Sequence, residues 1–130
     1  MKRLLSVAIP VILWLGICSC EAEQSFPAER LHSTQARNHG KALFQKHCVL
    51  CHGKRADGKA AQKSGRILLL RGHPPDFNNP VWRKKVSALK VFKAIRDGVR
   101  GTSMRGWDSL NDEEKWDLTA YILSIHEQGP

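Results

Sequence analysis

The sequence is poor in the residues that would build a disulfide framework or a sheet. Its four cysteines fall in two close pairs, Cys18/Cys20 and Cys48/Cys51, and the first pair ends an apolar N-terminal segment. The single remaining pair cannot form a disulfide network, so a cystine-rich scaffold is excluded. No strand-like alternation of apolar and polar residues and no internal repeat is present, which favours an all-α fold with long loops.

Long apolar runs are missing beyond one short N-terminal stretch. Residues 4–17 are mostly apolar, with interruptions, and they follow Lys2-Arg3. A charged start before about fourteen apolar residues is typical of a secretory signal, and the run is too short for a comfortable transmembrane span. We therefore expect residues 1–20 to be a signal peptide, with an uncleaved N-terminal anchor as the alternative.

The cleavage site has two interpretations. Ile17-Cys18-Ser19-Cys20 resembles a bacterial lipobox, which would leave Cys20 as the lipidated first residue, whereas ordinary cleavage would fall after Ala22. Both routes predict export to the periplasm, in a soluble or a lipid-anchored form. The polar residues 21–33 are expected to be a tether, and residues 34–128 the folded domain.

The five residues Cys48-Val49-Leu50-Cys51-His52 form the most informative motif of the chain. Two thiols three positions apart can each add to one vinyl group of the same porphyrin, and the next residue can present an imidazole to the iron. The motif predicts one covalent haem c, held by Cys48 and Cys51, with His52 as the proximal ligand. Such a haem would also act as a staple for a small core.

Other uses of a Cys-x-x-Cys pair fit less well. A thioredoxin-type redox pair expects a βαβ context, which the sequence does not show. A structural zinc site needs two more ligands at suitable spacing, and no second cysteine pair follows. A simple disulfide between Cys48 and Cys51 would leave His52 without a role.

Acidic residues are scarce through the middle of the chain. Between Arg37 and Arg105 there are 17 Lys and Arg residues against three acidic ones, whereas the final segment is acidic around Lys115. A net charge of +9 first suggests nucleic-acid binding. In an exported haem protein, however, this charge is better suited to an acidic redox partner or an anionic membrane surface, and no nucleic acid is expected.

Three segments combine an N-cap residue with apolar residues at helical spacing, namely residues 34–47, 88–97 and 112–128. Their expected caps are Ser33 or Thr34, then Ser87, and finally Asn111, which has Glu114 three residues later.

Met104 is the predicted sixth ligand of the iron. It is the only methionine apart from Met1, and it lies in a glycine-bearing loop, residues 98–106, that does not resemble a core stretch. A thioether opposite a histidine would place the potential of the haem toward the positive side.

The sequence leaves two alternatives to Met104 at the sixth position and suggests a supporting contact for His52. His73 lies in a loop of a suitable kind and would give a bis-histidine haem of lower potential. An open sixth position would instead permit ligand binding or peroxide chemistry. On the proximal side the second nitrogen of His52 needs an acceptor, for which the carbonyl of Pro75 or Pro74 is the natural candidate.

With these motifs the chain resembles the class I monohaem cytochromes c, closest to the small bacterial types of the cytochrome-cbb3-like group, over residues 36–126. The resemblance rests, in chain order, on Cys48-x-x-Cys51-His52-Gly53, Asp57-Gly58-Lys59, Pro74-Pro75-Asp76-Phe77, Gly98-x-x-Gly101-Thr102-x-Met104 and Trp116-x-Leu118-x-Ala120-Tyr121-Ile122. The haem motif is highly specific, while the others gain weight from their order and spacing. The resemblance implies a cytochrome c fold, with three to four helices and long loops wrapped around one haem.

The resemblance also implies a particular helix contact. In that family a glycine and an aromatic residue on the first helix meet an aromatic residue on the last, and Gly40, Phe44 and Tyr121 match these positions. The glycine would allow close approach, and the two rings would pack across the contact. Arg105 is a departure, since the family usually has proline after the ligand methionine, and its positive charge should favour the reduced iron.

Functionally the resemblance implies a periplasmic one-electron carrier with a single haem c, ligated by His52 and Met104, and no catalytic activity of its own. A haem c subunit of a larger dehydrogenase or oxidase complex is an alternative. A haem sensor or peroxidase-like protein with a labile sixth ligand is another. Redox partners with acidic docking sites are expected, and the candidate contacts are Arg83, Lys84, Lys85, Lys93, Arg100 and Arg105.

Overall fold

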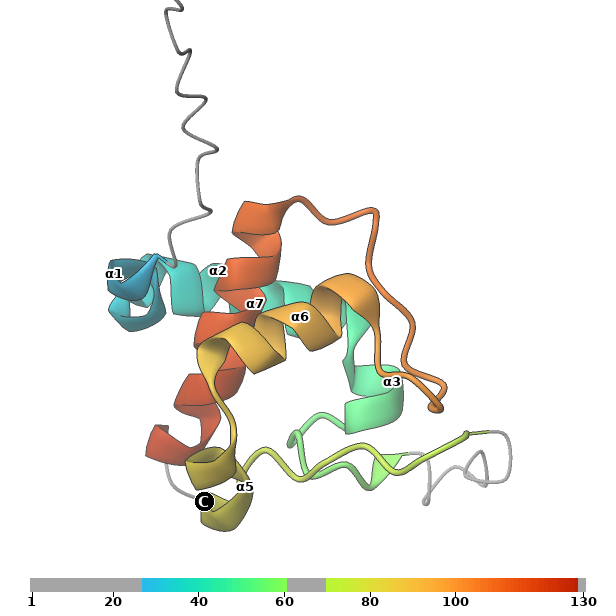
Figure 1. Cartoon of the computed structure of the whole chain (residues 1–130). Helices are drawn as coiled ribbons and strands as arrows, with labels where there is room; N and C mark the ends of the chain where they lie inside the picture. Colours follow the sequence, from blue (N-terminus) through green and yellow to red (C-terminus); the bar gives the residue numbers. More distant parts are fainter. Residues whose placement is uncertain (1–26, 61–69, 129–130) are drawn as a thin grey trace, which may run out of the picture.

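The computed structural model describes residues 27–60 and 70–128, and this part of the chain is helical (Figure 1). Its elements are α1 (Ala28–His32), α2 (Thr34–His47), α3 (Val49–His52), α5 (Pro80–Lys85), α6 (Ala88–Asp97), α7 (Asp112–Ser124) and a 3₁₀ helix, η2 (Ile125–Gln128). Within the described residues there is no strand, and an isolated bridge joins Gly98 to Arg105. The prediction of an all-α fold is confirmed, although the short helices raise the number above the three to four expected.

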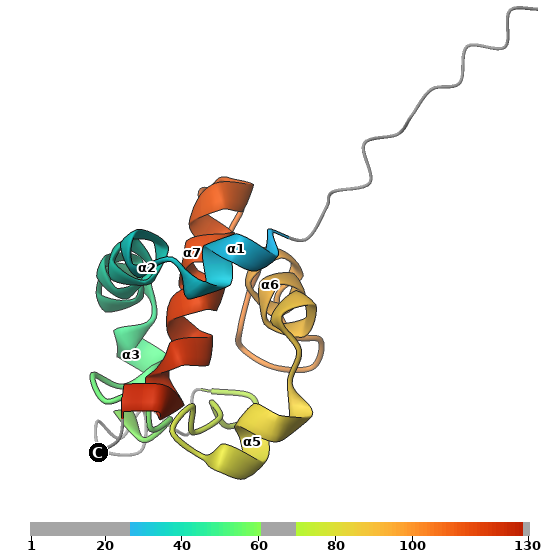
Figure 2. The ribbon, with the colours of Figure 1, turned by 90° about the vertical axis from the view of Figure 1, so that its left-hand side faces the viewer.

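The centre of the fold is the crossing of α2 and α7, which Figures 1 and 2 show from two sides. A β-carbon on Gly40 would lie 2.0 Å from the carbonyl oxygen of Asp117 and 2.9 Å from the Tyr121 β-carbon, so only glycine fits at this contact. One turn further along α2, the rings of Phe44 and Tyr121 meet edge to face with centroids 5.4 Å apart. The expected contact between Gly40, Phe44 and Tyr121 is therefore confirmed.

The three long helices begin where their capping residues predicted. The hydroxyl oxygens of Ser33 and Ser87 accept hydrogen bonds from backbone N–H groups in the first turns of α2 and α6. Asn111 and Glu114 form a complete capping box at the start of α7, with two reciprocal bonds of 2.9 Å. Each bond satisfies an N–H group that the helix itself leaves without a partner.

Helix α1 was not predicted, and it corrects the extent of the expected tether at residues 21–33. Arg30 from α1 donates a 2.5 Å hydrogen bond to the buried carboxylate of Asp117 on α7 and also pairs with Glu113. The folded unit therefore includes α1, N-terminal to the boundary expected at residue 34. The expected signal peptide lies outside the described residues, among which no helix is long and apolar enough to cross a membrane.

Helix α6 packs on α7, whereas α5 lies near the end of α7, where the Arg83 side chain donates a hydrogen bond to the Leu123 carbonyl at 3.3 Å. Asn79 caps α5 and Pro80 occupies its first turn, where a proline loses no helical hydrogen bond. Trp82 of α5 contacts Phe77 with ring centroids 4.8 Å apart, and Phe92 of α6 stacks on Trp116 of α7 at 4.1 Å. The first contact joins the loop after the Pro74-Pro75 segment to α5, and the second joins α6 to α7.

Candidate haem site

Helix α2 leads the chain directly into the cysteine motif. The Cys48 N–H donates to the Phe44 carbonyl, which continues the helical path, and α3 then adds a single turn in which the His52 N–H donates to the Cys48 carbonyl. This turn places Cys48 and Cys51 on one side of the chain, and Leu50 between them is 65% exposed. Gly53 ends the turn at a φ of 86°, a backbone conformation suited to glycine.

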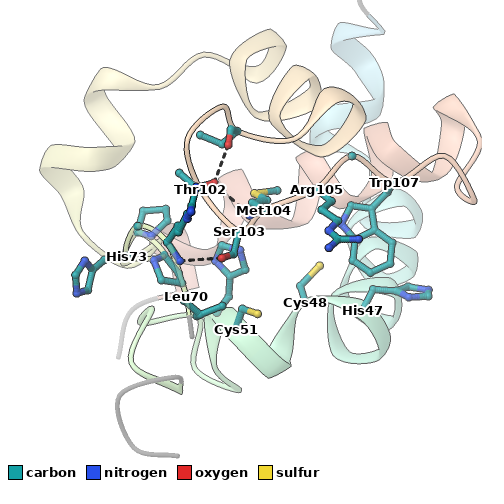
Figure 3. A pocket seen from close by; sticks show the side chains of 17 residues that line it. His47, Cys48, Cys51, Leu70, His73, Thr102, Ser103, Met104, Arg105 and Trp107 are labelled. Carbon is teal, nitrogen blue, oxygen red and sulfur yellow. Dashed lines mark hydrogen bonds between the residues drawn. The ribbon is translucent and has the colours of Figure 1, made fainter. Parts of the chain in front are cut away.

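The two cysteines face a mostly apolar cavity of about 420 Å³ (Figure 3). Its walls come from three separate parts of the chain: residues 47–52, residues 70–75 and the loop of residues 99–107. All the predicted site residues line this one cavity, namely Cys48, Cys51, His52, Pro74, Pro75 and Met104. The fold thus brings together two thiols, an imidazole and a thioether that lie up to 56 residues apart in the sequence.

His52 is the buried histidine of the site. Its ring stacks on Phe77, with centroids 4.8 Å apart and an interplanar angle of 18°. Burial lowers the pKa of His52 to about 4, so the imidazole is neutral at pH 7, which is the form that binds a metal. Its Nδ1 atom is buried and makes no hydrogen bond within the described residues.

The acceptor predicted for that nitrogen lines the same cavity but is not bonded to it. Pro74 and Pro75 line the cavity, and a β-carbon on Gly58 would lie 2.3 Å from the Pro74 carbonyl oxygen. Gly58 also donates its N–H to the His52 carbonyl. The proline segment is therefore held against the loop that follows His52, while the bond from His52 Nδ1 to Pro75 stays a prediction.

The raised pKa of the Cys48 thiol disfavours a thioredoxin-type pair. Burial, with a smaller contribution from Cys51, raises the pKa of Cys48 to about 12. A redox-active or metal-binding cysteine needs a lowered pKa, because the thiolate is the reactive form. In addition, no cluster of three or more His, Cys, Asp or Glu side chains able to hold a metal ion occurs in the part of the chain that the structure describes.

Met104 lies on the opposite wall in a loop with its own hydrogen bonds. The Val99 N–H donates to the Met104 carbonyl at 3.0 Å, and the Met104 N–H donates to the Thr102 hydroxyl at 3.2 Å. That hydroxyl in turn donates to the Val99 carbonyl at 2.8 Å. The backbone of Met104 is thus tied on both sides within the loop, which fixes where its side chain enters the cavity.

The rival histidines are placed less favourably. His73 lines the cavity, but it is exposed, and Figure 3 shows its ring pointing away from the sulfur atoms of Cys48, Cys51 and Met104. His47 also lines the cavity and packs its ring edge to face on Trp107 at 5.0 Å.

Three contributors to the site had no role assigned from the sequence. Phe77 supports the His52 ring, Trp107 contacts His47 at one end of the cavity, and Ser103 bonds to Arg71. Their importance depends on contacts between distant segments, which no local pattern in the sequence reveals.

Comparison with known proteins identifies the family. The model of a family described as cytochrome c oxidase, cbb3-type, subunit III matches residues 35–122. The chain belongs to this cbb3-type cytochrome c family. The expected family resemblance is confirmed, and membership implies binding of haem c and a role in electron transfer.

A curated relative of this cytochrome is the thiosulfate dehydrogenase of Allochromatium vinosum. The two are 34% identical over 89 residues, which make up 66% of this chain and 30% of the relative. The chain therefore spans less than a third of the length of that protein.

The residues of the cavity are suited to the haem c that the family binds. A neutral imidazole with a buried Nδ1 atom and a thioether on the facing wall are the two iron ligands typical of cytochromes c. Two thiols at the edge of the same apolar cavity are suited to thioether bonds.

Proposed function

We propose that this cytochrome is an exported one-electron carrier with a single haem c. Cys48 and Cys51 would hold the haem covalently, and His52 and Met104 would ligate its iron. The observation that supports this most strongly is that these four side chains, which come from residues 47–52 and from the loop of residues 99–107, line the same apolar cavity. When bound, the haem supplies a one-electron redox couple whose potential depends on the axial ligands and on burial.

The surrounding residues position these ligands. Phe77 stacks on His52 and limits rotation of the imidazole, while the cavity keeps it neutral. In the proposed state the Nδ1–H of His52 donates to the Pro75 carbonyl, which would fix the tautomer of the ring and tune the iron. Met104 is positioned from its own backbone, by Thr102 and Val99.

An electron carrier suits this arrangement better than an enzyme does. If the protein supplies both His52 and Met104 as ligands, no coordination position on the iron is left for a substrate. Electron transfer does not require such a position. A sensor or peroxidase-like protein would instead need a sixth ligand that leaves readily.

Export is supported by the N-terminal sequence. The Lys2-Arg3 start and the apolar run at residues 4–17 have the order of a bacterial signal. We place the mature cytochrome in the periplasm, either free after cleavage near Ala22 or anchored through a lipidated Cys20.

The charge around the cavity favours acidic partner proteins. Arg71 and Arg105 line the cavity and are exposed, so they present positive charge where an electron would enter or leave. A complementary acidic surface would raise the rate of encounter.

The proposal is tested by the spectrum of the ferric protein matured in the periplasm. We expect a low-spin haem with the weak near-infrared band that arises from charge transfer between sulfur and iron. Met104→Ala should abolish this band and leave a high-spin iron that binds carbon monoxide readily once reduced. The matched control is Leu89→Ala, a change of an exposed apolar side chain on α6, which should leave the band intact.

Other spectra would contradict the ligand assignment. A low-spin wild-type spectrum without the band would point to a nitrogen ligand, with His73→Ala as the next variant. A high-spin wild-type spectrum would reopen the sensor or peroxidase-like alternative.

A second candidate function is suggested by the curated relative. Because the relative is named a thiosulfate dehydrogenase and this cytochrome spans only 30% of it, the chain could supply the haem c part of a larger oxidoreductase. Affinity purification of the tagged cytochrome under mild conditions separates the two possibilities. A stoichiometric catalytic chain and thiosulfate-dependent reduction of the haem would support the complex, whereas a monomer unreduced by thiosulfate would support the free carrier.

A further inference from the structure

We propose that Ser103 is a positioning residue that keeps the Met104 thioether at the sixth position and limits the access of outside ligands. This inference rests on the proposed function, in which Met104 ligates the iron. It goes further by naming the contact that joins the loop carrying Met104 to the wall formed by residues 70–75.

Two hydrogen bonds connect residue 71 to Ser103, and Figure 3 draws the one that reaches the Ser103 hydroxyl. The Ser103 N–H donates to the Arg71 carbonyl at 2.9 Å, and the Arg71 N–H donates to the Ser103 hydroxyl oxygen at 2.8 Å. Next to them Gly72 passes close to Thr102, since a β-carbon on Gly72 would lie 3.0 Å from the Thr102 methyl carbon. We call this pair of bonds the Arg71–Ser103 clasp.

The loop with Met104 can move as one unit because its hydrogen bonds are mostly internal. Val99, Thr102 and Met104 bond to one another, and Gly98 pairs with Arg105. These bonds fix the shape of the loop but not its distance from the wall formed by residues 70–75. The clasp sets that distance at Ser103, the residue directly before Met104.

At the other end of the cavity, the loop has a weaker contact with the wall formed by residues 47–52. There the rings of His47 and Trp107 touch edge to face, a contact without a hydrogen bond. Movement of the whole loop away from the haem space therefore has to break the clasp at one end and the aromatic contact at the other. Local opening of this kind involves far fewer contacts than global unfolding.

The clasp has little influence on the stability of the whole fold. Both Arg71 and Ser103 are exposed, so water replaces much of each lost hydrogen bond, and the α2–α7 crossing lies elsewhere. A role in positioning and a merely structural role thus make different predictions. Loss of a positioning residue changes the exchange of the sixth ligand, whereas loss of a merely structural residue changes only the unfolding transition.

The experiment compares imidazole binding to the ferric forms of wild type and Ser103→Ala, followed through loss of the sulfur-to-iron band. Because one hydrogen bond is removed, we expect the association constant for imidazole to rise about fivefold, while the urea midpoint falls only by the small amount that one exposed hydrogen bond contributes. Ser103→Thr keeps the hydroxyl and should restore wild-type binding. Ser87→Ala is the matched control, since it removes the hydroxyl that caps α6 and should lower the urea midpoint without changing imidazole binding.

Three results would overturn the inference. Imidazole affinity could be unchanged in Ser103→Ala, Ser103→Thr could behave like Ser103→Ala, or Ser87→Ala could raise the affinity equally. In each case the band in the wild-type protein would still support Met104 as the ligand. Absence of the band from the wild type would instead reject the proposed function on which the inference depends.

Discussion

Burial affects the pKa values of His52 and Cys48 in opposite directions and leaves both groups uncharged at neutral pH. It lowers the pKa of His52 to about 4 and raises that of Cys48 to about 12, because the charged form of each is disfavoured away from water. A neutral imidazole and a neutral Cys48 thiol suit a mostly apolar cavity that receives a large, largely apolar group. The protonation states thus agree with the family to which the chain belongs.

Tyr121 permits a pH test of the same principle in the core. Burial raises its pKa, so the folded state keeps the phenol neutral beyond the pH at which it ionises in the unfolded chain, about 10. Its contribution to stability is complete below that pH and is lost as the pH rises through the higher folded value. We expect the free energy of unfolding to fall more steeply above pH ~10 in wild type than in Tyr121→Phe.

Urea titrations across the alkaline range, on both proteins with the haem attached, measure this difference. The lysines ionise in the same range but are identical in the two proteins, so their contribution cancels. Since Tyr121 is the only tyrosine in the chain, the ultraviolet absorbance of phenolate reports its ionisation directly. Parallel curves for wild type and Tyr121→Phe would contradict the argument.

At the residue scale, the sequence predicts a site residue only where the side chain has rare chemistry. Cys48, Cys51 and His52 form a spacing with few other uses, and Met104 is one of only two methionines. Ser103 could not be found this way, because serine is common and its partner is a backbone group of residue 71.

At the scale of elements, the α2–α7 crossing depends on one missing β-carbon. Alanine in place of glycine normally stabilises a helix by about 1 kcal/mol. At Gly40, however, the added atom would collide with backbone atoms of Asp117, which cannot turn away as a side chain could. We expect Gly40→Ala to lower the free energy of unfolding by about 1 to 3 kcal/mol, because the helices must separate and their packing loosens.

Urea unfolding monitored by helical circular dichroism measures this loss. Asn38→Ala, at an exposed position of the same helix, is the matched control and should be neutral or slightly stabilising. Equal midpoints for the two variants would show that α7 yields at the crossing and that glycine is not required there.

Capping signals predicted the long helices well and the short ones poorly. Ser33, Ser87 and Asn111 each mark the start of a helix, because a side chain satisfies an N–H group that only a helix start leaves free. Helices α1 and α5 are only five and six residues long, which is too short to be stable alone. They form through tertiary contacts such as Arg30 with Asp117, and a local pattern does not contain these.

At the scale of the whole molecule, the fold reduces the negative charge of the acidic final segment of the sequence. The acidic start of α7 is partly neutralised, since Arg30 pairs with Glu113 and Asp117 while Lys115 pairs with Asp112. Figures 1 and 2 agree that this start lies at the opposite end of α7 from α5, whose last turn is basic. Positive charge therefore dominates the electrostatics of the described surface, including the side of the cavity.

The position of that charge, and not only its total, should control reactions with anions. We expect the ferrous protein to reduce hexacyanoferrate(III) more slowly as salt is added, because screening weakens the attraction. In water about 1 kcal/mol acts between one guanidinium group and a trivalent anion about 10 Å away. Replacing Arg71 and Arg105, which line the cavity, by glutamine should therefore slow the reaction roughly thirtyfold at low ionic strength.

A double variant with the same net charge tests whether location matters. Lys41→Gln with Lys90→Gln removes two exposed charges from α2 and α6 that do not line the cavity, and it should slow the reaction much less. Stopped-flow rates at several salt concentrations compare the two variants, whose difference should vanish near ~1 M salt, where the Debye length is about 3 Å. Equal slowing in both would mean that the oxidant responds only to total charge. A larger effect of the lysines would place the route of electron transfer away from the cavity that contains Cys48, Cys51 and Met104.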